Sequence, residues 1–102
     1  MSATAILFLL LPGEESAWHK VASDELWFHT WGGRLALQLG GEGPEAGETV
    51  VLGAHPDAGH ALQGVVRAGV WQRAQPLDDE PVLVSCVVTP GFTFTDFELH
   101  RP

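Results

Sequence analysis

Several side chains that can transfer protons or bind a metal fall within one short stretch of the sequence. His19 is followed by Glu25 and His29, and Trp27 lies between the last two. A histidine beside a carboxylate can act as a general base or acid near neutral pH. Imidazole and carboxylate groups are also frequent ligands of transition metals. The stretch therefore indicates either proton transfer or a metal site.

Two short strands are expected to position these side chains. Residues 16–21 and 25–31 read as strands, joined by a turn. Because successive side chains of a strand alternate between its two faces, one face should carry His19, Val21, Glu25, Trp27, His29 and Trp31. A barrel interior would receive His19, Val21, Glu25, Trp27 and His29 together. Trp27 and Trp31 share the Glu25 face, where they would either pack in the core or form a wall beside the polar groups.

The rest of the chain predicts a single all-β domain over residues 1–102. Twelve Gly and seven Pro separate short apolar runs, and no long amphipathic helix or linker divides the chain. Val82–Val88 is rich in β-branched residues and predicts a central strand. Further strands are expected at residues 4–11, 34–39, 49–53, 63–66, 70–74 and 92–99, with an acidic loop at 40–48.

The charge balance of the sequence argues against nucleic acid and anionic membranes as partners. Five Lys and Arg against thirteen Asp and Glu give a charge of −8, so we expect no nucleic acid and no anionic membrane surface as partners. The apolar run 6–11 has no preceding Lys or Arg and is far shorter than the roughly 20 residues that span a bilayer. We expect it to be a buried strand. The single cysteine, Cys86, fits a reducing cytoplasm.

Three pieces of the sequence resemble the motifs of one known superfamily. The spacing G-x5-H-x-V-x3-E-x6-G at residues 13–32 resembles the first cupin motif, with Val21 in place of its second histidine. A weaker match to the second motif puts Gly69 at its turn and Gln72 at its histidine. Together with the ending P-G-F-x-F-x-D-F-E at residues 90–98, these pieces look like the cupin-5 family, also called DUF985.

The resemblance covers residues 5–99 and implies an all-β cupin jelly-roll β-barrel, a double-stranded β-helix of two packed antiparallel sheets, usually present as a homodimer. It implies no particular activity, because fold relatives range from sugar-nucleotide epimerases to metal-dependent dioxygenases. The family's His-Pro-Glu-Gly-Gly-Tyr motif is not found before Ala5. We therefore expect a more open pocket, or one that a partner subunit completes.

The same resemblance gives a test for a metal. A cupin centre commonly uses three histidines and a glutamate, which here correspond to His19, Val21, Glu25 and Gln72. If a divalent transition metal is present, the resemblance implies His19, Glu25 and Gln72 as ligands, and His29 could add one. Valine cannot bind metal and glutamine is a weak ligand, so we expect no tightly bound metal and no other cofactor.

We therefore expect a metal-free pocket for a small, sugar-like molecule. Its catalytic pair would be His19 as base and Glu25 orienting it, and its ligand-binding residues would be Gln72, His29 and Trp27. The sequence leaves open whether the protein is an enzyme. If it is one, isomerase- or epimerase-like proton transfer on a carbohydrate or related polar metabolite is the first expectation.

Two other interpretations stay open. One is a divergent metal-dependent, dioxygenase-like cupin, and the other is a non-catalytic barrel in which His19 and Glu25 form a buried hydrogen-bonded pair. The chain contains no tyrosine, the acid of cupin epimerases, so an acid would have to be His29, His60, Glu25 or water. We expect Cys86 to be an inert buried thiol.

Overall fold

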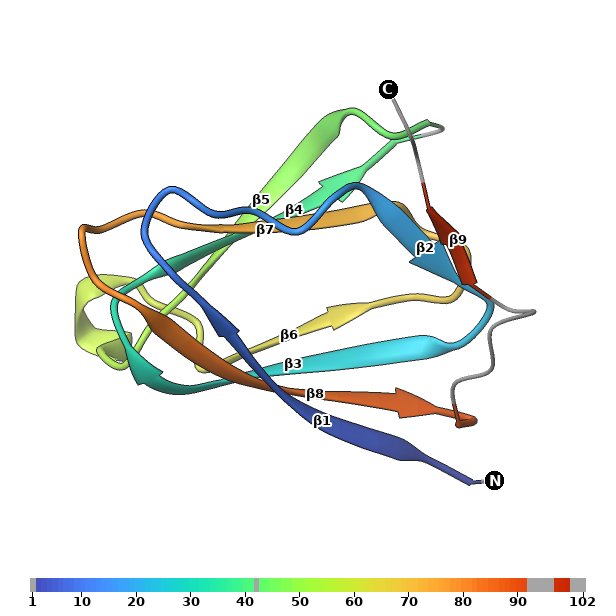
Figure 1. Cartoon of the computed structure of the whole chain (residues 1–102), viewed down its shortest axis with the longest axis horizontal. Coiled ribbons are helices and arrows are strands. Elements are labelled where there is room, and N and C mark those ends of the chain that lie inside the picture. Colours follow the sequence, from blue (N-terminus) through green and yellow to red (C-terminus); the bar gives the residue numbers. More distant parts are fainter. Residues whose placement is uncertain (1, 42, 92–96, 100–102) are drawn as a thin grey trace.

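Two antiparallel sheets contain nearly all of the regular structure of the protein (Figure 1). The computed structural model describes residues 2–41, 43–91 and 97–99. Its elements are β1 (Thr4–Leu10), β2 (His19–Val21), β3 (Asp24–Gly32), β4 (Leu35–Gly40), β5 (Ala46–Leu52), a short 3-10 turn η1 (Pro56–Ala58), β6 (Gln63–Val66), β7 (Gln72–Pro76), β8 (Val82–Thr89) and β9 (Phe97–Leu99). None of the helical structure in these ranges is long and apolar enough to cross a membrane.

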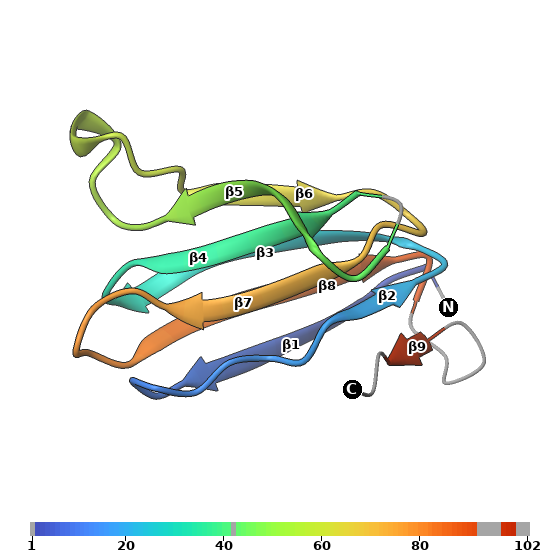
Figure 2. The same cartoon turned by 90° about the horizontal axis from the view of Figure 1, so that it is seen from above.

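The strand orders are β1-β8-β3-β6 in one sheet and β5-β4-β7-β2-β9 in the other. Figure 1 looks along the two layers from the side, and Figure 2 looks onto their faces. β8 lies between β1 and β3, which confirms that Val82–Val88 forms a central strand. The predicted jelly roll of two packed antiparallel sheets is thus the observed fold.

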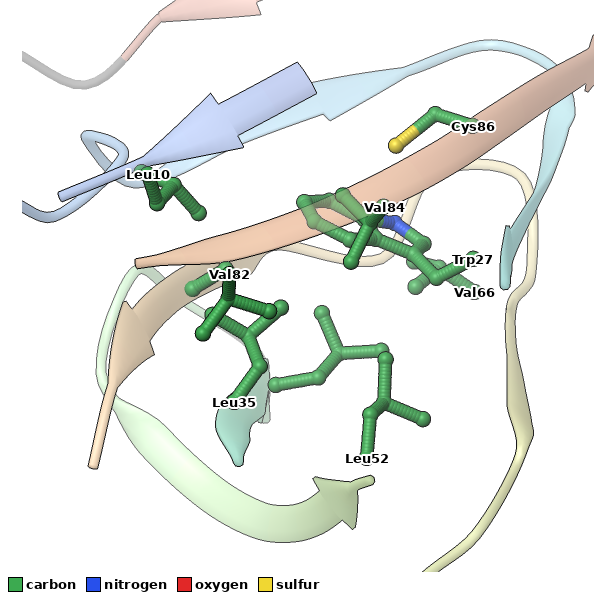
Figure 3. Packing of buried hydrophobic residues seen from close by; sticks show 10 residues of the cluster. Leu10, Trp27, Leu35, Leu52, Val66, Val82, Val84 and Cys86 are labelled. Carbon is green, nitrogen blue, oxygen red and sulfur yellow. The ribbon is translucent and has the colours of Figure 1, made fainter. Parts of the chain in front are cut away.

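The core lies between the two sheets (Figure 3). Strand β8 shows how it forms, because every second side chain from Val82 onward is buried while those between are only partly covered. This two-residue period turns one face of the strand toward the opposite sheet. The buried apolar cluster comprises Leu10, Trp27, Leu35, Leu37, Leu52, Val66, Ala74, Val82, Val84 and Cys86.

A β-bulge near the end of β3 turns the side chain of Trp31 to the outer face of the sheet. His29 pairs with the buried Val84, but the register then shifts and Trp31 pairs with Leu83, on the outer face. Trp31 is 59% exposed. The expectation that it shares the inner face with Glu25 is therefore wrong, because an extra residue in a bulge interrupts the alternation.

The apolar run at residues 6–11 is a strand as far as Leu10, but the expectation that it is buried is wrong. β1 is an edge strand that pairs only with β8 among the described strands. Leu10 is buried, whereas Ile6 is 54% and Leu7 69% exposed. A strand at an edge has one neighbour, so even its inward side chains can remain partly uncovered.

Two further boundaries differ from the sequence expectation. β5 begins at Ala46, inside the segment expected to be an acidic loop, because Gly40 and Ala46 pair across a second bulge to close a tight hairpin. At the other end of the chain, β9 pairs with β2, but most of the strand expected at residues 92–99 lies outside the described residues.

Candidate functional site

A cavity of about 270 Å³ lies between the inner face of the β1-β8-β3 sheet and strand β2. Most of its wall is apolar, and the polar groups gather at the side chains of His19 and Glu25. The complete lining is Thr4, Ile6, Phe8, His19, Val21, Glu25, Trp27, Cys86 and Val88. A mostly apolar cavity with a few converging polar groups is typical of a small-molecule site.

The chain crosses from one sheet to the other between the two polar residues. β2 belongs to the five-stranded sheet and places His19 and Val21 on the cavity, while β3 belongs to the four-stranded sheet and places Glu25 and Trp27 there. The connection between β2 and β3 is only two residues long. The short motif is therefore enough to bring an imidazole and a carboxyl group to one cavity from opposite sheets.

A chain of buried hydrogen bonds runs behind Glu25. Trp27 Nε1 donates to Gln72 Oε1 over 2.8 Å, and Gln72 Nε2 donates to Glu25 Oε1 over 2.7 Å. The indole N–H can only donate, so it fixes the orientation of the amide. Gln72 is fully buried and does not line the cavity. It supports Glu25 from behind.

Burial raises the pKa of Glu25 above its ordinary value, because the charged carboxylate loses its hydration. The hydrogen bond from Gln72, the charge of His19 and a hydrogen bond with Cys86 oppose this shift without cancelling it. Glu25 therefore holds a proton at a higher pH than an exposed glutamate does. A carboxyl group with a raised pKa can act as an acid as well as an acceptor.

The imidazole of His19 is held by the backbone. Its Nδ1 lies 2.8 Å from the carbonyl oxygen of Ala17. A carbonyl only accepts, so Nδ1 carries the proton in the neutral ring and Nε2 is the basic nitrogen. His19 thus has the tautomer of a general base, and its ring lines the same cavity as Glu25.

Only some of the predicted site residues line the cavity. His19, Glu25 and Trp27 line the cavity, and Gln72 lies behind Glu25. His29 does not line it: its Nε2 lies 2.8 Å from the carbonyl oxygen of Gly33, at the bulged end of β3.

Sequence reasoning missed five lining residues, namely Thr4, Ile6, Phe8, Cys86 and Val88. The alternation along residues 4–10 and 82–88 could have placed each on one face of its strand. Cys86 is buried, and burial together with the nearby Glu25 raises the pKa of its thiol. This agrees with an inert thiol.

The residues present do not fit a cupin metal centre. The only metal-binding atom of Gln72, Oε1, accepts the hydrogen bond from Trp27, and the amide nitrogen faces Glu25. Val21 has no donor atom. Among residues 2–41, 43–91 and 97–99, no three His, Cys, Asp or Glu side chains are grouped so that they could hold a metal ion. Both polar atoms of Gln72, the residue in the position of a cupin histidine, are thus engaged in hydrogen bonds within the protein.

Comparisons with known proteins agree with this architecture. The family model described as the cupin superfamily (DUF985) matches residues 1–100, and no curated protein gives a significant match. A protein of Shewanella oneidensis with a known crystal structure is 36% identical, with a TM-score of 0.88 over 97% of this chain and 62% of its own. A hypothetical protein from Leishmania major is 29% identical, with a TM-score of 0.88 over 98% and 65%.

A more distant structure shares the fold alone. The dTDP sugar isomerase of Desulfovibrio desulfuricans is 19% identical, with a TM-score of 0.79 over 98% of this chain and 65% of its own. This chain therefore spans less than two thirds of the length of each of the three proteins.

Proposed function

Because this chain belongs to the cupin-5 (DUF985) family of the cupin superfamily, we propose that it binds a small, sugar-like polar molecule in the cavity lined by His19 and Glu25. The observation that carries this proposal is the position of these two side chains. A buried carboxyl group with a raised pKa and a histidine face one cavity whose walls are otherwise mostly apolar. Such a pair is typical of a site that binds and transfers protons.

The cavity supports a binding role over a purely structural one. In a structural barrel the two polar residues would be enclosed by packed side chains, whereas here about 270 Å³ of space reaches both. This volume lies just below the range of roughly 300–1,000 Å³ that is typical of ligand pockets. It suits a single sugar ring or a molecule of similar size, with Phe8 and Trp27 as the aromatic part of the wall.

The chemistry that fits the site is proton transfer next to a carbonyl group. His19 Nε2 removes a proton from the carbon beside the carbonyl. The electron pair of the C–H bond forms a carbon–carbon double bond, and the π electrons of the carbonyl move to its oxygen. Glu25 in its protonated form donates a hydrogen bond to that oxygen, which stabilises the developing negative charge. Return of a proton to carbon completes an isomerisation or epimerisation without any other reactant.

The position of the candidate acids favours Glu25 in this scheme. Of His29, His60 and Glu25, only Glu25 lines the cavity. Its carboxyl group is held by Gln72, so Gln72 is a positioning residue rather than a ligand-binding one. The shared fold with a dTDP sugar isomerase supports a carbohydrate as the first substrate class to test. We expect the protein to act in the cytoplasm as a homodimer.

Ligand binding and proton exchange test the proposal together. Wild type, His19→Ala and Glu25→Gln would be titrated calorimetrically with aldoses, ketoses and dTDP-sugars. The same compounds would be incubated in D₂O and examined by NMR for deuterium beside the carbonyl. His55→Ala, in the loop at residues 54–60 and away from the cavity, is the matched control.

We expect both cavity variants to weaken binding at least tenfold and to abolish deuterium incorporation, while His55→Ala behaves like wild type. Near-stoichiometric iron, zinc, nickel or manganese in untagged protein, lost in both variants, would instead support a metal-dependent cupin. If no compound binds and Glu25→Leu increases stability, the barrel is structural.

A further inference from the structure

We propose that the cavity selects against negatively charged ligands, so that it takes a free sugar ring or a similar uncharged molecule rather than a phosphorylated or nucleotide-linked one. This inference rests on the proposed function, because it narrows the class of molecule that the same site binds. The argument depends on where the positive charges of the chain lie. Of the five Lys and Arg side chains, the structure describes Lys20, Arg34, Arg67 and Arg73, and Arg101 lies outside the described residues.

The described wall of the cavity contains no lysine or arginine. Its polar groups are the hydroxyl of Thr4, the imidazole of His19, the carboxyl of Glu25 and the thiol of Cys86. A phosphate or carboxylate group that leaves water needs a cation or several hydrogen-bond donors in return. These four side chains offer no fixed positive charge, so this wall offsets little of the free energy that burial of an anion costs.

Strand alternation turns Lys20 away from the cavity. Lys20 lies between His19 and Val21 on β2, and both of those residues line the cavity, so the lysine side chain points to the opposite face. There its Nζ lies 3.2 Å from Oε2 of Glu98 and 5.1 Å from the ring centroid of Trp71. The cation that adjoins the base in the sequence is thus engaged on the outside of the five-stranded sheet.

Arg73 repeats this arrangement on β7. It follows the fully buried Gln72, so its own side chain points outward. Its Nε donates a 2.9 Å hydrogen bond to Oε1 of Gln38, and its guanidinium carbon lies 4.9 Å from the ring centroid of Trp18. Its Nη1 lies 4.0 Å from Oε2 of Glu15. The same alternation that supplies the cavity with its polar groups therefore removes the two neighbouring cations from it.

The other two described cations are paired with aspartates. Arg67 Nη1 lies 3.7 Å from Oδ2 of Asp24, at the start of β3. Arg34 follows the far end of β3, which crosses most of the molecule in Figure 1, and its Nη2 donates a 2.7 Å hydrogen bond to Oδ1 of Asp78. Each of the four described cations thus has an acidic partner, and none lines the cavity.

The charge of the whole chain and the proposed reaction act in the same direction. Thirteen acidic against five basic side chains give a net charge of −8, which disfavours the approach of an anion. The proposed reaction develops one negative charge on the carbonyl oxygen of the ligand, and Glu25 has one proton to offer it. A phosphate group in the same space would compete for that proton.

Pairs of probes that share a ring and differ in charge test the inference. Wild type would be titrated with D-glucose, D-galactose and D-mannose and with the 6-phosphate of each, and ligand-observed NMR would give each Kd. Benzamide and benzoate form a further pair that does not depend on sugar chemistry. Loss of binding in His19→Ala reports that a probe occupies the cavity. We expect each uncharged probe to bind at least tenfold more tightly than its anionic partner.

A cation placed in the cavity wall should reverse this preference. Ile6 lines the cavity and is 54% exposed, so the side chain introduced by Ile6→Lys can stay in contact with water while it faces a bound anion. We expect Ile6→Lys to bind benzoate and the hexose 6-phosphates at least tenfold more tightly than wild type does. Leu7→Lys adds the same charge on the opposite face of β1 and should keep the wild-type preference. Thr4→Lys replaces Ile6→Lys if circular dichroism shows that the latter is unfolded.

The outcomes separate this inference from the proposed function. If no hexose binds but benzamide binds more tightly than benzoate, the sugar-like ligand is wrong and the selection against anions stands. If the hexose 6-phosphates bind at least as tightly as the hexoses and His19→Ala abolishes both, the proposed function stands and this inference is overturned. Anion binding that Arg101→Ala abolishes would also overturn it, as would a failure of every uncharged probe to bind.

Discussion

The indole Nε1 of Trp27 donates a 2.8 Å hydrogen bond to Oε1 of Gln72, and this contact decides what Gln72 can do. It directs the amide nitrogen toward Glu25, 2.7 Å away. In the reverse orientation two donors would face each other at Trp27. The residue that stands in place of a metal-binding histidine is therefore a donor to the neighbouring carboxyl group.

Replacing Gln72 should destabilise the fold. Gln72→Leu would leave the indole N–H of Trp27 and the carboxyl of Glu25 without this partner in a buried site. Each of the two groups costs about 1–3 kcal/mol, so we expect the free energy of unfolding to fall by about 2–6 kcal/mol. Urea unfolding measures it. Gln75→Leu, in the same strand but only half-buried, should change it by less than about 0.5 kcal/mol, and equal losses in both variants would contradict the prediction.

Glu25 should make the protein less stable as the pH rises. Below its ordinary pKa of 4.5 the carboxyl is protonated in both the folded and the unfolded chain, so it does not alter stability. Above its raised folded-state pKa it is ionised in both, and the folded chain then contains a buried charge. Stability should therefore fall from pH 4.5 upward through the folded-state pKa, and Glu25→Gln should remove this component.

Urea unfolding between pH 4.5 and about 8 measures that difference between wild type and Glu25→Gln. Glu48→Gln, an exposed glutamate on β5, is the control and should follow wild type. Asp78 does not contribute to the pH dependence in this range. Arg34 lowers the pKa of the Asp78 carboxyl to about 2, so the stability that this ion pair contributes is lost only in stronger acid. Identical pH profiles of stability for wild type and Glu25→Gln would show that folding does not raise the pKa of the Glu25 carboxyl.

Cys86 should react slowly with thiol reagents in the folded protein. Burial raises the pKa of its thiol, and the charge of Glu25 raises it further, while the reactive species is the thiolate. Glu25→Gln removes that charge, so we expect alkylation by iodoacetamide to become several-fold faster at about pH 8. Glu48→Gln should leave the rate unchanged. An alkylation rate that Glu25→Gln leaves unchanged would show that the charge of Glu25 does not act on the Cys86 thiol, and would contradict the prediction.

A single substitution should introduce the metal binding that the wild-type donor set does not support. Val21 is buried and lines the cavity with His19 and Glu25, so Val21→His would supply a third ligand. We expect calorimetry to show stoichiometric Ni²⁺ or Zn²⁺ binding at least tenfold tighter than any binding by wild type. Ala22→His, at the exposed neighbouring position, should not gain this affinity. Equal affinities for Val21→His and Ala22→His would contradict the assignment of the cavity.

The sequence by itself determined the strands and the pair at the cavity. The β-branched residues of Val82–Val88 predict a central strand, because branched side chains pack well on the pleated surface of a sheet. The spacing from His19 to Glu25 is equally local: two strands and a short turn suffice to place both side chains on one cavity.

Only the tertiary structure decided the features that depend on pairing between distant segments. A bulge against β8 turns Trp31 outward, and no alternation within β3 predicts it. Gln72 is 45 residues from Trp27 in the sequence, and the donor that fixes its amide is visible only after the two sheets pack. β1 is exposed because its place at the edge of the sheet, rather than its hydrophobicity, sets how many neighbours cover it.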